Sequence, residues 1–159
     1  MIGFILFGMA LVFTLIHKTL VKQAEPREIL LSYLLFFNIG IMGLIAFSGH
    51  IFKSDQIAAL IGWPPGSPFQ LEVGVADLAF GVLGILSLYF RGLFWVATVV
   101  SSSIFLMGNF CIHMDSYLDH NKAPYNSGIL VWFGNLVIPI CLLMLLRSYL
   151  KNFHSFPKF

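Results

Sequence analysis

The sequence predicts an all-α polytopic membrane protein, a bundle of about five transmembrane helices. Of its 159 residues, 58% are hydrophobic and only 10% are charged, whereas soluble domains carry roughly 25% charged residues. Five apolar segments match the roughly 20 residues that a helix needs to cross the hydrocarbon core. They cover residues 2–21, 29–52, 68–90, 93–114 and 127–149. Because the connections are short, we expect residues 1–159 to form a single transmembrane domain.

The first two segments have few polar features. Residues 2–21 have no basic region before them and no small-residue cleavage site after them, so we expect a retained first helix. Segment 29–52 contains Gly40 and Gly43. Small residues let membrane helices approach each other closely. We interpret these glycines, together with those at positions 74, 81 and 84, as packing residues.

The third segment has a well-marked beginning. Ser67 suits the N-cap, Pro68 the first helical position and Gln70 the reciprocal arm of a capping box. Upstream, residues 63–66 (Trp-Pro-Pro-Gly) cannot continue a helix, and Trp63 favours the membrane interface. We therefore expect a rigid turn at the membrane surface.

The last two segments follow tight turns. Segment 93–114 comes directly after Arg91-Gly92. Segment 127–149 contains Pro139, which removes a hydrogen-bond donor and crowds the carbonyl of Asn135, so a kink is expected. Cys111 and Cys141 fall at different depths of their helices, so we expect no disulfide.

The distribution of basic residues predicts the orientation. Short cytoplasmic loops are enriched in Lys and Arg. One side of the predicted bundle holds Lys18, Lys22, Arg27, Arg91, Arg147, Lys151 and Lys158, and the other holds only Lys53 and Lys122. This pattern predicts that the N-terminus lies outside and the C-terminus in the cytoplasm. For a bacterial inner-membrane protein, the outside is the periplasm. A net charge of +2 without a basic run indicates no nucleic-acid partner.

Asp77 is the most informative residue within a predicted span. At about 1.5 Å of rise per residue, it lies roughly 9 Å below the outer boundary if the helix enters hydrocarbon near Leu71. An ionised carboxylate there costs about 2.5–3.5 kcal/mol on insertion scales. Asp77 should therefore face the bundle interior, with a partner or in protonated form. An interhelical hydrogen bond is an equally good interpretation.

Matched depth suggests one pocket between the third and fourth segments. Glu72 and His113 should lie at the rim, with Asp77 and Asn109 one to two turns beneath. Buried polar groups in lipid must find each other or a cavity. We expect Glu72 beside His113 and Asp77 nearer Asn109, while Gln70 and Trp63 complete the predicted binding residues.

The same residues could ligate a metal. Carboxylate and imidazole donors from Glu72, Asp77 and His113, with Asp115 and His120 as further outer ligands, would suit a divalent transition metal. Neither H-x-x-x-H nor E-x-x-H spacing occurs. The alternative for Asp115 and His120 is a solvated loop.

Three stretches carry a family resemblance: GWPPGSPFQLEVGVADLAFG (62–81), ATVVSSSIFLMGN (97–109) and NKAPYNSG (121–128). There the chain resembles an uncharacterised family of small bacterial integral membrane proteins, over Gly62 to Leu146. More distantly it is similar to DoxX-like four-helix membrane proteins, which share a Gly/Pro turn and a helix opening with Glu and Gly. That likeness implies an accessory role in quinone-linked sulfur oxidation, and it carries over only at Glu72 and its turn.

These observations leave three function classes open. The first is a membrane accessory protein or subunit whose outer-facing polar pocket binds a metal, a quinone or a partner in a redox system. The second is a proton-linked small-solute transporter using Asp77, although inverted repeats are not evident. The third is an interaction protein whose polar residues only specify packing. The expected partners are the lipid bilayer and a membrane protein or second copy, and no residue is assigned a catalytic role.

Overall fold

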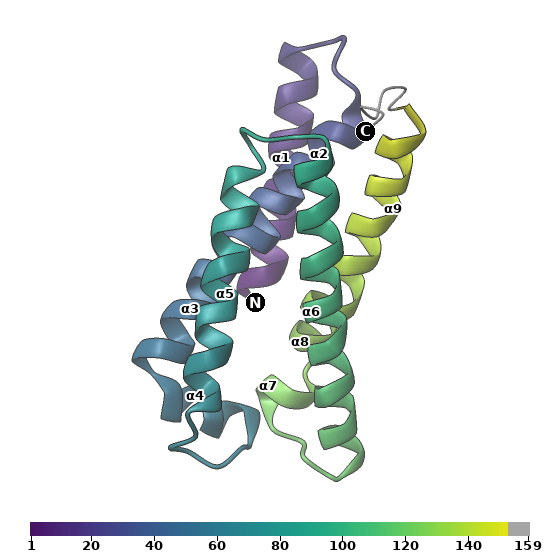
Figure 1. The fold of residues 1–159 in the computed structure, drawn as a ribbon. Coiled ribbons are helices and arrows are strands. Elements are labelled where there is room, and N and C mark those ends of the chain that lie inside the picture. Colours follow the sequence, from purple (N-terminus) through teal and green to yellow (C-terminus); the bar gives the residue numbers. More distant parts are fainter. Residues whose placement is uncertain (153–159) are drawn as a thin grey trace.

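The computed structural model describes residues 1–152, and these residues are helical apart from their connections (Figure 1). The elements are α1 (Ile2–Leu20), α2 (Pro26–Leu34), the π-helix η1 (Leu35–Ile41), α3 (Met42–Phe52), α4 (Ser54–Ile61), α5 (Phe69–Leu86), α6 (Leu93–Leu118), α7 (Pro124–Ser127), α8 (Ile129–Trp132), the π-helix η2 (Phe133–Val137) and α9 (Ile138–Asn152). The all-α prediction is confirmed for the part of the chain that is described.

Five helices in this range are long and apolar enough to cross a membrane. They are Ile2–Leu20, Pro26–Phe52, Phe69–Leu86, Leu93–Leu118 and Phe133–Lys151. Their number matches the sequence prediction, but four ends differ by three residues or more. The second helix begins at Pro26 rather than 29 and the fifth at Phe133 rather than 127, whereas the third stops at Leu86 rather than 90 and the fourth continues to Leu118 rather than 114. Hydropathy marks where a chain leaves lipid, whereas a helix continues as long as its backbone hydrogen bonds do.

The fifth span is irregular at its beginning. After α7, the short helix α8 leads into η2, and Pro139 lies in the first turn of α9. Proline has no N–H and its ring crowds the carbonyl four residues earlier, here that of Asn135. Residue 135 lies within η2, and the wider π-turn is a common way to accommodate such a disruption. The irregularity expected from Pro139 is therefore present.

Glycines set the spacing between the second and third spans. A Cβ added to Gly84 would lie 2.3 Å from the backbone nitrogen of Gly40, and one added to Gly43 would lie 2.8 Å from the carbonyl oxygen of Asp77. The predicted close approach of these helices is confirmed. As a result, α5 packs mainly on α3 and η1, whereas α6 packs mainly on α9 and η2.

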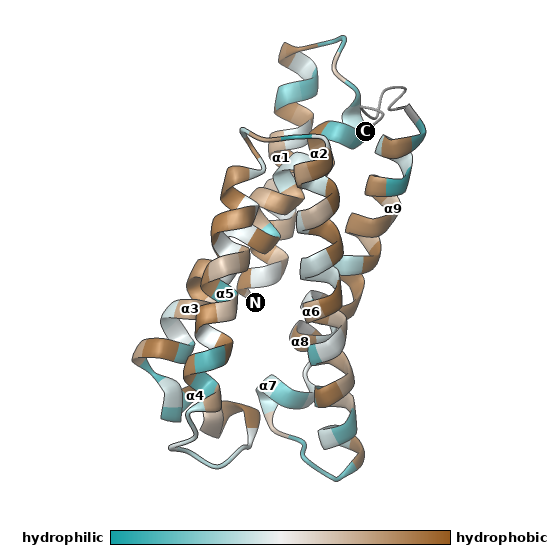
Figure 2. Ribbon diagram, in the orientation of Figure 1, coloured by the Kyte–Doolittle hydropathy of each residue, from teal (hydrophilic) through white to brown (hydrophobic). Residues whose placement is uncertain are grey.

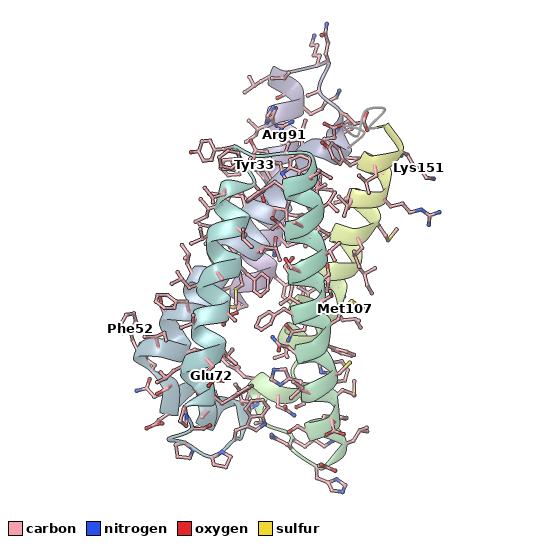
Figure 3. The ribbon with its side chains drawn as sticks, in the orientation of Figure 1. Tyr33, Phe52, Glu72, Arg91, Met107 and Lys151 are labelled. Carbon is pink, nitrogen blue, oxygen red and sulfur yellow. The ribbon has the colours of Figure 1, made fainter. Side chains whose placement is uncertain are left out.

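The bundle has two polar ends and an apolar middle (Figure 2). We call the end that carries α4 and α7 the cap end, and the opposite end, where Figure 3 labels Arg91 and Lys151, the basic end. The helices α5 and α6 meet at the basic end and diverge toward the cap end (Figure 1).

Lys158 of the predicted basic set lies outside the described residues. The cysteines Cys111 and Cys141 are free, as expected.

Candidate functional site

A chain of three polar side chains links α3 to α5 near the cap end. His50 Nδ1 lies 2.7 Å from Gln70 Oε1, and His50 Nε2 lies 3.9 Å from Asp77 Oδ2. Because Gln70 Oε1 is an acceptor, Nδ1–H donates to it. The facing atoms of His50 and Asp77 then attract each other only if a proton resides on Nε2 or on the carboxyl group. The arrangement therefore brings two titratable side chains, one from α3 and one from α5, to within 3.9 Å of each other.

His50, Gln70 and Asp77 are largely shielded from solvent, so each must find its polar partners within the protein. The side chains of His50 and Asp77 are only 17% and 14% exposed, and Gln70 is 3% exposed. Gly74 stands beside them, since a Cβ there would lie 3.1 Å from His50 Cβ. The missing side chain at Gly74 leaves the space that lets His50 reach α5.

A second polar group forms where α6, α7 and the turn after α4 meet. His113 Nδ1 lies 3.0 Å from Asn126 Oδ1, and the His113 ring stacks on Trp63 with centroids 5.7 Å apart and planes at 14°. Asn126 is fully buried, and its Nδ2 donates to the carbonyl of Asn121 at 2.9 Å. Asn126 thus contacts the edge of the His113 ring and Trp63 contacts its face.

Asn121 links the end of α4 to the end of α6 by hydrogen bonds. Its Nδ2 donates to the Ile61 carbonyl at 2.9 Å and to Ser116 Oγ at 3.0 Å, and its Oδ1 accepts from the Ala123 N–H at 3.0 Å. Gly62, which ends α4 with a φ of +81°, packs directly against it. A Cβ at Gly62 would lie 2.5 Å from Asn121 Oδ1. Only glycine combines this conformation with this contact.

A cavity of about 350 Å³ lies beside the turn that precedes α5. It is lined by Trp63, Pro64, Ser67, Phe69 and Gln70. Two of its walls belong to the polar groups already described, since Gln70 binds His50 and Trp63 stacks on His113. The cavity therefore has apolar walls and polar side chains behind them.

A model of a protein family, DUF6790, matches residues 1–153. The chain belongs to this family of unknown function. Neither the curated proteins nor the solved structures give a match. DUF6790 membership fits the expected resemblance to an uncharacterised family and assigns no activity.

The structure arranges the predicted pocket residues of this DUF6790 member differently from the sequence prediction. Asp77 faces His50 of α3, and His113 binds Asn126. The carboxylate of Glu72 is exposed, at the cap end of α5 (Figure 3), and within residues 1–152 it has no hydrogen bond or ion pair. Among residues 1–152, no hydrogen bond or ion pair joins Glu72 to His113 or Asp77 to Asn109. Depth was matched, but α5 turns its Asp77 face to α3 and diverges from α6.

The predicted metal ligands are likewise not brought together. Among the described residues, no three His, Cys, Asp or Glu side chains form a group that could hold a metal ion. Asp115 and His120 are exposed at the end of α6, where a solvated loop was the alternative. The Asp77 and His50 pair supplies two donors, which is fewer than a typical transition-metal site uses.

Sequence reasoning missed His50 and misassigned Gln70. His50 was an isolated histidine at a span end, and Gln70 was expected to complete a capping box. Ser67 Oγ does accept the Phe69 N–H at 3.3 Å, but the Gln70 amide binds His50 instead. The available signal was depth, because His50 lies in the last turn of α3 and Gln70 in the first turn of α5, and these two turns are both at the cap end of the bundle.

Proposed function

We propose that this protein is a membrane accessory protein whose cap-end cavity binds a ligand of the quinone class for a redox partner. The observation that carries the proposal is the position of Gln70. Its amide is 3% exposed, lines the cavity and is hydrogen-bonded to His50 behind it. A small-molecule site typically combines apolar walls with a few fixed polar groups, and this cavity has that composition.

The chemistry of the cavity suits a quinone headgroup. Trp63, Pro64 and Phe69 offer flat apolar surfaces to a planar ring. Because Gln70 Oε1 is taken by His50, its Nε2 remains available to donate to a ring carbonyl. Ser67 Oγ accepts a backbone bond and keeps its own proton as a second donor. A quinone tail would continue into the bilayer beside the spans.

The His50 and Asp77 pair lies behind Gln70, on the side away from the cavity. It fixes the orientation of the Gln70 amide and provides two titratable groups one side chain further from the cavity. The likeness to DoxX-like proteins at the turn before Glu72 supports the same class of ligand. In the orientation predicted from the basic residues, the cavity opens on the outer side of the inner membrane.

A binding titration tests the proposal. The protein is reconstituted in nanodiscs and titrated with a short-chain ubiquinone or menaquinone analogue, with empty nanodiscs measuring partition into lipid. Gln70→Leu should weaken binding about tenfold, since a buried hydrogen bond to the ligand is lost. Gln56→Leu makes the same chemical change at an exposed position of α4 outside this cavity, and its binding should equal that of the wild type.

Two results would contradict the proposal. One is a wild-type titration that cannot be distinguished from empty nanodiscs. The other is equal affinity of Gln70→Leu and Gln56→Leu, which would place the ligand elsewhere. Proton uptake by proteoliposomes that depends on Asp77 and on no quinone would instead favour the transporter class, for which the largely buried Asp77 beside His50 is the supporting observation.

A further inference from the structure

Charge is divided between the two ends of the bundle. The basic end holds Lys18, Lys22, Arg27, Arg91, Arg147 and Lys151 against the carboxylates Glu25 and Glu28. The cap end holds Lys53 and Lys122 against Asp55, Glu72, Asp115 and Asp119. The described part of the chain therefore has a net charge of +4 at one end and −2 at the other.

Among the described residues, no carboxylate forms an ion pair with a cation of the basic end. Within residues 1–152 the one ion pair is His50 with Asp77, so no Lys or Arg there pairs with a carboxylate. Lys18 donates to the Ala24 carbonyl at 2.9 Å, and the guanidinium of Arg91 lies 5.2 Å from the centre of the Trp95 ring. These two side chains are occupied locally. The remaining cations are available to an external anion.

Arg27 reaches across the seam between α2 and α9, and Arg147 and Lys151 flank its partner Ser148 on α9. Arg27 Nη1 donates to Ser148 Oγ at 3.0 Å across this seam, which leaves further donors of its guanidinium free. Arg147 and Lys151 are exposed and four residues apart, so they lie on one face of α9. The seam thus combines a fixed guanidinium with two adjacent cations.

The same face of α9 is apolar below these cations. Ile140 and Met144 precede Arg147 and Lys151 at helical spacing and are 42% and 68% exposed. From Ile140 to Lys151, this face of α9 therefore changes from exposed apolar side chains to cations at the end of the helix. A phospholipid has the complementary order, with acyl chains below a phosphate headgroup.

We propose that the seam of Arg27, Arg147, Ser148 and Lys151 binds the headgroup of an anionic phospholipid, with an acyl chain along Ile140 and Met144. Arg and Lys form strong charge-assisted hydrogen bonds with phosphate oxygens, and clusters of basic residues at the ends of membrane helices bind such headgroups. The site is independent of the cavity at the cap end and of the ligand proposed for it.

Native mass spectrometry of the detergent-solubilised protein tests this site. The protein is titrated with phosphatidylglycerol and, separately, with phosphatidylcholine of the same acyl chains. The wild type should retain phosphatidylglycerol preferentially. Arg27→Gln with Arg147→Gln should weaken that retention about 30-fold, from two lost basic contacts. Lys53→Gln with Lys122→Gln removes the same charge at the cap end and should leave retention unchanged.

Further measurements separate binding from folding and from general charge. If the first double variant aggregates, Arg147→Gln with Lys151→Gln replaces two exposed side chains and should show the same loss. Equal losses in the basic-end and cap-end variants would overturn the proposal, as would equal retention of the two lipids by the wild type. Displacement of the lipid by soluble glycerophosphoglycerol at equal concentration would also overturn it, because the acyl chain would then contribute nothing.

Discussion

Replacing Gly84 with alanine should force the second and third spans apart. The added Cβ would lie 2.3 Å from Gly40 N and 2.6 Å from both Gly40 Cα and Leu35 O. All three are backbone atoms, so no side-chain rotation can relieve the overlap. Ordinary van der Waals contact begins near 3.4 Å. The backbone of α5 must therefore move by about 1 Å relative to η1.

The expected cost is the difference between two effects. Overpacking of a well-packed interface costs about 1–3 kcal/mol, and a backbone displacement places Gly84→Ala toward the upper value. Alanine in a helix interior recovers roughly 0.5–1 kcal/mol relative to glycine. We expect a net loss of about 2 kcal/mol in the free energy of unfolding. Because His50 reaches α5 across the same interface, affinity for the cavity ligand should fall as well.

Two further glycines provide a matched series. Gly108 lies within α6, and a Cβ there would have nothing within 4 Å, so Gly108→Ala should keep or slightly raise stability. Gly40→Ala is intermediate, since its Cβ would lie 3.0 Å from Ile85 N. The measurement is the fraction of monodisperse protein by size-exclusion chromatography after heating in detergent. The predicted order of stability is Gly108→Ala, then Gly40→Ala, then Gly84→Ala.

Equal midpoints for Gly84→Ala and Gly108→Ala would refute this reasoning. They would show that the interface between η1 and α5 is wider than the described contact. A large loss in Gly108→Ala would refute it equally, because that change meets no neighbouring atom.

Three other predictions follow from the polar groups and the charge distribution. Asn121→Ala should lower the free energy of unfolding by about 1–3 kcal/mol, since it removes two donated hydrogen bonds; an unchanged melting temperature would mean that the cap end is held otherwise. Asp77→Asn should melt like the wild type, whereas Asp77→Leu should lose about 1–2 kcal/mol; equal stability of the two variants would show that the carboxyl group makes no stabilising contact. In a cysteine-free background, a cysteine at Lys122 should react with an impermeant maleimide in intact cells and one at Lys151 should not, and the reverse pattern would invert the predicted orientation.

The sequence alone determined the class of protein and the number of long helices. Whether a segment enters lipid depends on its own composition over about 20 residues, which is a local property. Depth along a helix is also local, because the rise per residue is constant. For this reason Trp63, Gln70 and His113 were all correctly expected near one end of the bundle. The irregularity at Pro139 followed from the chemistry of one residue.

Only the tertiary structure decided which polar groups meet. Rotation of a helix about its axis is set by contacts with residues far away in sequence, here the glycines that seat α5 on η1 and α3. Because of that rotation, the Asp77 carboxyl group faces His50 of α3 rather than Asn109 of α6, and Glu72 is exposed. The hydrogen bond from Asn121 to the carbonyl of Ile61, 60 residues away, likewise holds the turn after α4 against α6, where Trp63 stacks on His113. A linear pattern fixes depth and composition, whereas partners depend on packing between segments that the sequence does not place side by side.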